Sequence, residues 1–135
     1  MSDQTPKNRF LESLDRCALS DEFVPSFYKR FLSSSDEIRN KFQTTDFERQ
    51  NKMLLASLRL TANATAGDPD SLRELGERAE SHDRHHLNIR PELYEFWRDS
   101  LIATAKGFDE HWDDQTESAW QNSLRYVISH MSRQY

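Results

Sequence analysis

Hydrophobic residues recur every three or four positions along most of this chain, which is the spacing of one face of an α-helix. Such stripes predict helices over 8–19, from Ser20 onward, and on both sides of position 69. The stripe of the second helix consists of Phe23, Phe27, Tyr28 and Phe31. No segment has the pattern of a strand. The chain is therefore predicted to be all-α, with six or seven helices.

Several boundaries of these helices are marked by residues that cap helices. Ser34 with Glu37, and Thr45 with Glu48, have the spacing of a capping box, in which each side chain bonds the other's backbone N–H. We therefore expect a short helix to begin at the first pair and a long one at the second. Gly67-Asp68-Pro69 is expected to end the long helix and begin the next.

The last third of the chain predicts two further helices. The first follows Pro91, and its stripe is Leu93, Phe96, Trp97, Leu101 and Thr104. A polar break at 109–114 precedes the final helix, whose stripe is Trp120, Leu124, Val127, Ile128 and Met131. Without a repeat or linker, 1–135 is expected to form a single domain, in which 1–7 are a disordered extension.

Composition narrows the function. The 135 residues include only 3 Gly and 4 Pro, and the net charge is −5 with scattered basic residues. The negative net charge and the scattered basic residues argue against nucleic acid or a membrane as a partner. The polar N-terminus lacks an apolar signal core, so a cytoplasmic location is expected. A single cysteine, Cys17, excludes a disulfide framework or a cysteine-rich zinc site.

Three of the five histidines lie between positions 82 and 86. The stripe of the helix after Pro69 continues from Leu75 to His82 and then His86, so a histidine is expected to face the core. Such an imidazole is hydrogen-bonded within the core, binds zinc with its neighbour, or is the one protein ligand of a haem iron. This segment offers too few ligands for zinc. Helical periodicity alone does not decide whether His82 or His86 faces the core.

Three stretches carry a resemblance to a known family: FYKRFLSSSDEIRNKF (27–42), AESHDRHHLNIRPELYEFWRDSLI (79–102) and ESAWQNSL (117–124). Their order and separation resemble those of bacterial single-domain globins and of the haem domain of flavohaemoglobins. The likeness runs from about Phe10 to Met131. It implies a globin fold around a haem pocket.

This resemblance assigns His82 as the proximal ligand of the haem iron. Ser81 corresponds to the residue whose hydroxyl bonds the other nitrogen of that imidazole. Phe42 corresponds to the phenylalanine on the porphyrin face, and Tyr28 to the distal tyrosine. A strict alignment would place Arg84 at the ligand position, but arginine does not ligate iron, so a longer corner after the helix is expected.

The resemblance also implies the remaining pocket residues. Gln50 corresponds to the distal polar position and Leu54 to the apolar residue over the ligand. If this helix were aligned with the globin pattern two residues later, Lys52 would lie at the mouth of the pocket and Arg49 inside it. The pocket walls are expected to include Leu87, Ile89, Tyr94, Trp97 and Val127. His86 is assigned to the haem edge, and Arg84 or Arg90 to the propionates.

The expected function is reversible binding of dioxygen, and of carbon monoxide or nitric oxide, at a histidine-ligated haem b. One alternative is an enzyme, a nitric oxide dioxygenase or peroxidase, which would need a reductase in trans. A further alternative is a haem-free, globin-like interaction module. The oligomeric state is expected to be monomer or homodimer, since no apolar seam distinguishes them.

Overall fold

The structure, a computed structural model, describes residues 5–43, 45–82 and 90–133, except the side chains of 78–82. Seven α-helices and no strand lie within these ranges, which confirms the all-α prediction. They are α1 (Pro6–Ala18), α2 (Phe23–Ser33), α3 (Asp36–Lys41), α4 (Phe47–Thr65), α5 (Pro69–His82), α6 (Leu93–Phe108) and α7 (Asp114–Arg133).

The starts of the first helices differ slightly from the expected ones. α1 begins at Pro6, capped by the Thr5 hydroxyl, so the helix includes two residues assigned to the N-terminal extension. The cap of α3 is Ser35, whose Oγ accepts a hydrogen bond from the amide of Ile38. The Ser34 hydroxyl instead donates to the last turn of α2. Neighbouring serines compete for one cap, and sequence spacing does not decide between them.

The two ends of the connection from α4 to α5 lie where the sequence indicates. Gly67 has a φ of 89°, a left-handed conformation that glycine adopts without a steric penalty, and it lies just beyond the end of α4. Pro69 begins α5, and the Asp68 carboxylate accepts a hydrogen bond of 2.9 Å from the amide of Ser71. At the other end of α4 the cap is Asp46, one residue after the expected Thr45.

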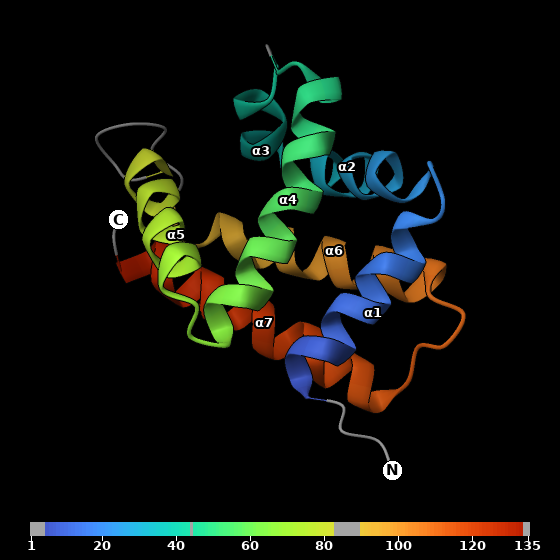
Figure 1. Cartoon of the computed structure of the whole chain (residues 1–135). Helices are drawn as coiled ribbons and strands as arrows, with labels where there is room; N and C mark the ends of the chain where they lie inside the picture. The colour runs from blue at the N-terminus through green and yellow to red at the C-terminus, as the bar shows by residue number, and fades with distance from the viewer. Residues whose placement is uncertain (1–4, 44, 83–89, 134–135) are drawn as a thin grey trace.

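The helices form two unequal groups (Figure 1). α1 packs against α2, α6 and α7, and α6 packs against α2 and α7. Across the described residues, α5 packs chiefly against α4 and α7, and it lies on the opposite side of α4 from α1 and α2. None of the helices in the described ranges is both long and apolar enough to cross a membrane.

The hydrophobic core is divided in the same way. The larger cluster joins buried residues from six helices, among them Phe10, Phe27, Leu58 and Trp120. The smaller cluster has only Ala64, Leu75 and Val127 as buried members, with partly buried side chains packed around them. Because α5 contributes only to the smaller cluster among its described side chains, it has less buried apolar surface to hold it than its neighbours.

The larger cluster contains a buried polar network that the sequence did not suggest. Asp109, expected in a polar break, is 4% exposed. Its carboxylate accepts hydrogen bonds from Ser13 Oγ at 2.6 Å and from Arg16 Nε and Nη2 at 2.5 and 2.9 Å. Trp120 Nε1 in turn donates to Ser13 Oγ at 2.9 Å. The network thus joins α1, the α6–α7 connection and α7.

The single cysteine and one aromatic residue complete this description. Cys17 is fully buried, its thiol donates to the Ala105 carbonyl oxygen at 3.6 Å, and burial raises its pKa to about 12. Phe96, expected on the inner stripe of α6, is 39% exposed instead. The adjacent Trp97 is half-buried and takes the inward position.

The Asp109 network predicts a pH dependence of stability. Burial raises the pKa of Asp109, but the hydrogen bonds of Arg16, Ser13 and the His111 amide outweigh it and leave the pKa below the ordinary 3.8. A carboxyl group whose pKa is lower in the folded than in the unfolded state stabilises the fold at any pH above its unfolded pKa. That stabilisation is lost as the pH falls through the pKa of the folded state. Asp109→Asn should cost about 2–3 kcal/mol at neutral pH and flatten the acid limb.

Urea unfolding between about pH 3 and pH 7 measures both effects. The matched control is Asp113→Asn, since the pKa of Asp113 is lowered by an exposed helix cap, the amide of Thr116. An Asp109 variant as stable and as acid-sensitive as the control would contradict the prediction.

Candidate functional site

A cavity lies between the two hydrophobic clusters. Its volume is about 200 Å³, and the hollow around it is partly open to solvent. Its described lining comes from α2, α3, α4, α5, α6 and α7. The lining residues are Tyr28, Phe31, Ile38, Lys41, Phe42, Gln50, Met53, Leu54, Ser57, Leu58, Thr61, Leu75, Leu93, Tyr94, Trp97, Val127, Ile128 and Met131.

α4 supplies one whole wall of this cavity. Its lining residues are separated by three or four positions and therefore form a single face of the helix. They are Gln50, Met53, Leu54, Ser57, Leu58 and Thr61. Arg49 and Lys52 are exposed. The structure thus has the register that places Gln50 and Leu54 inside, and not the one two residues later.

Tyr28 and Gln50 meet inside the cavity. Burial raises the pKa of Tyr28 to about 12, and a side-chain hydrogen bond with Gln50 partly offsets the shift. The Tyr28 hydroxyl therefore stays protonated at neutral pH.

Aromatic packing fixes the positions of Tyr28 and Phe42. The ring of Tyr28 lies 5.4 Å from that of Phe47 and 6.3 Å from that of Phe42, between centroids. Phe42 also packs edge-to-face on Phe31 at 5.7 Å. Such contacts hold each ring in one orientation. The hydroxyl of Tyr28 and one side of Phe42 are therefore held at the cavity wall.

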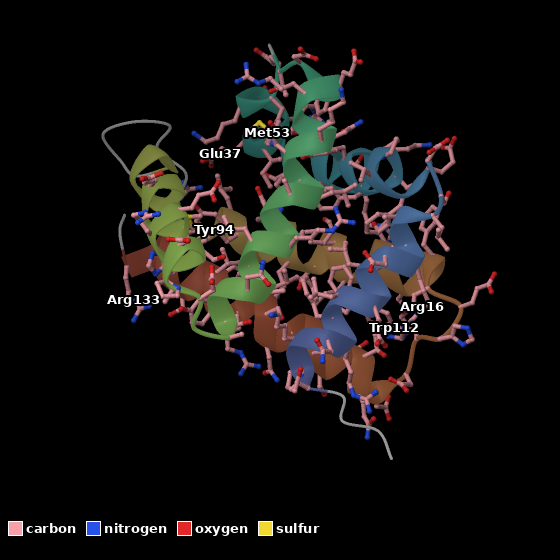
Figure 2. The ribbon with its side chains drawn as sticks, viewed as in Figure 1. Arg16, Glu37, Met53, Tyr94, Trp112 and Arg133 are labelled. Carbon is pink, nitrogen blue, oxygen red and sulfur yellow. The ribbon has the colours of Figure 1, made fainter. Side chains whose placement is uncertain are left out.

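The opposite wall contains the other predicted residues that the structure describes. Tyr94, Trp97 and Val127 line the cavity, and burial raises the pKa of Tyr94 to about 12. Figure 2 shows Tyr94 in the region between α4 and α5, far from Arg16 and Trp112. Within α5, Leu75 lines the cavity.

For the histidine segment, the structure describes only part of what was predicted. The backbone of Ser81 and His82 forms the last turn of α5, and His82 follows the cavity-lining Leu75 by seven residues, about two helical turns. His86, Leu87 and Ile89 lie outside the described residues, as does Arg84. Among the described residues, no group of three His, Cys, Asp or Glu side chains is placed to hold a metal ion.

Several lining residues were missed by the sequence interpretation, although a signal for some was present. The stripe of α4 that contains Gln50 and Leu54 continues with the same spacing to Ser57 and Thr61. Lys41 and Met53 had no comparable signal, because charged and flexible residues at a cavity mouth resemble ordinary surface residues. Figure 2 shows Met53 on α4 and Glu37 on α3, on the side of these helices that faces α5.

Arg90, one of the two arginines expected at the propionates, has a protein partner. Arg90 Nε donates to Glu37 Oε2 at 3.0 Å, and its Nη2 donates to Oε1 at 2.5 Å. A second carboxylate, that of Glu92, lies 3.7 Å from the guanidinium. This two-pronged ion pair links α3 to the segment that enters α6.

Comparisons with known proteins identify the family. Residues 25–131 match the globin family model, so the chain belongs to the globin family. Its fold is also similar to the crystal structure of protein PA3967 from Pseudomonas aeruginosa PAO1, described as structurally highly homologous to a human hemoglobin. The TM-score is 0.92 and the identity 35%, over 97% of this chain and 98% of that one. No curated protein matches the chain significantly. The predicted bacterial globin fold is thereby confirmed.

The divided core predicts that occupancy of the cavity changes the stability of α5 selectively. A ligand in the cavity would contact both clusters and restore packing that the lining side chains lack. Haemin is therefore expected to slow amide exchange in residues 69–77 more than in α1. Hydrogen exchange with and without haemin measures this difference, and uniform protection of both helices would contradict it.

Proposed function

We propose that this globin binds haem b in the described cavity and uses it to bind dioxygen, carbon monoxide or nitric oxide reversibly. The observation that carries the proposal is the cavity itself, which combines apolar and aromatic walls with a hydrogen-bonding pair, the buried Tyr28 and the half-buried Gln50. When bound, haem supplies an iron with an open coordination position for a diatomic gas.

The residues of this cavity fit a haem. The apolar side chains of Leu54, Leu58 and Leu93 suit a porphyrin, as do the rings of Phe42 and Trp97. Noncovalent binding, as in haem b, is supported by the position of the only cysteine. Cys17 belongs to the larger cluster and is absent from the described lining.

His82 is proposed as the protein ligand of the iron. The spacing of seven residues between His82 and the cavity-lining Leu75 supports this assignment, because such residues share one face of a helix. Ser81 is proposed to orient the imidazole through its hydroxyl. His86, Leu87 and Ile89 are proposed to complete the same side of the pocket.

Tyr28 is proposed to stabilise the bound gas. Its hydroxyl is protonated at neutral pH and hydrogen-bonds with Gln50, and it is proposed to donate toward an electronegative ligand. Hydrogen bonds of this kind slow dissociation and have less effect on association. The cavity chemistry thus favours retention of dioxygen over its rapid release.

The proposal for His82 is tested by absorption spectra of the haem-loaded protein, before and after dithionite and carbon monoxide. The parent protein should give an intense Soret band that shifts with carbon monoxide. His82→Ala should lose or strongly alter this band, whereas His111→Ala, a change at an exposed position, should not. A parent protein without a stable Soret band would overturn the haem proposal.

The role of Tyr28 predicts a kinetic effect. Tyr28→Phe should speed dioxygen dissociation by roughly 10- to 100-fold, the value of one hydrogen bond to a charged group. The matched control is Tyr126→Phe, which removes a hydroxyl from a half-buried tyrosine outside the described lining. Displacement of dioxygen by carbon monoxide in a stopped-flow instrument measures the rate, and equal rates in both variants would refute the role.

A further inference from the structure

A lysine, Lys41, stands at the wall of the cavity. Among the described lining residues, Lys41 is the only one with a charged side chain. It is the last residue of α3 and directly precedes Phe42. Lys41 is exposed to solvent as a whole. Its hydrocarbon stem therefore contributes to the wall, while the ammonium group remains hydrated at the cavity mouth.

Of the two arginines expected to bind the propionates, Arg84 lies outside the described residues and Arg90 is already engaged. Arg90 forms the two-pronged pair with Glu37. Its hydrogen bond is the main reason that the pKa of Glu37 is lowered, and the charge of Lys41 contributes a smaller attraction. None of the described carboxylates forms an ion pair with Lys41 itself. Among the described residues that line the cavity, Lys41 is thus the cation that remains for a ligand.

A ligand that is apolar over most of its surface and acidic at one edge matches this arrangement. The interior walls offer hydroxyl and amide groups but no positive charge among the described residues, so a carboxylate buried there would lose its hydration without compensation. At the mouth the same carboxylate would keep contact with water and approach an ammonium group. Haem b has this character, because both propionates project from one edge of an apolar ring.

We propose that Lys41 binds a propionate of the haem and so sets the edge of the porphyrin that faces the solvent. This inference rests on the proposed function and assigns the acidic edge to the mouth beside the end of α3. The apolar edge then lies deeper, toward Leu58, Leu75 and Leu93. Lys41 acts here as a positioning residue.

The test separates the charge of Lys41 from its packing. Lys41→Met keeps the length and the apolar stem but removes the ammonium group. Each protein is loaded with haem or with its dimethyl ester, which lacks the propionate charges. Transfer of the porphyrin to an excess of a high-affinity apo-globin is followed at the Soret band. The matched control is Lys52→Met, an exposed lysine on α4 outside the described lining.

The expected result is specific to one combination of protein and ligand. Lys41→Met should speed the loss of haem roughly three- to fivefold, the range for a solvent-exposed ion pair, and leave the loss of the dimethyl ester unchanged. Lys52→Met should change neither rate. An equal acceleration for both ligands, or equal effects of the two variants, would overturn the role of Lys41 while leaving haem binding intact. A parent protein that takes up neither ligand would overturn both proposals.

Discussion

The buried carboxylate of Asp109 holds together the half of the molecule that does not face the cavity. Its partners lie in α1, and through Ser13 it also orders the indole of Trp120 in α7. A charge on a buried side chain is costly unless its hydrogen bonds are complete, and here Ser13 and Arg16 donate to it. The network therefore requires one relative position of α1, the α6–α7 connection and α7.

Because this network holds α1 and α7 in place, the helices around the cavity can be packed less completely. Leu58 belongs to the larger cluster and Leu75 to the smaller, yet both border the cavity. Side chains next to a void lose attractive contacts on that side, so the protein without a ligand is less stable than a fully packed one would be. α4 reaches both clusters and supplies the wall between them. A bound ligand would thus complete a core that the chain itself leaves open.

The fold was predictable because helical periodicity reflects burial over long segments, as in α4 and α7. The Gly67 and Pro69 signals were equally reliable, since only backbone geometry is involved. Single positions were less predictable. Phe96 points outward and Asp109 inward, because partners distant in sequence decide both. The place of Tyr28 and Gln50 in the cavity lining was predictable from resemblance and helical phase together. The place of Lys41 was not, because an exposed lysine resembles an ordinary surface residue in the sequence.

The sole thiol of the chain has a different consequence. Cys17 is fully buried, and with a pKa of about 12 it remains protonated at physiological pH. Oxidation and nitrosation proceed through an accessible thiolate, so this side chain resists both. A protein whose proposed ligands include dioxygen and nitric oxide therefore carries no readily consumed sulfhydryl, and prolonged exposure to those gases should leave it neither covalently modified at this position nor cross-linked into dimers.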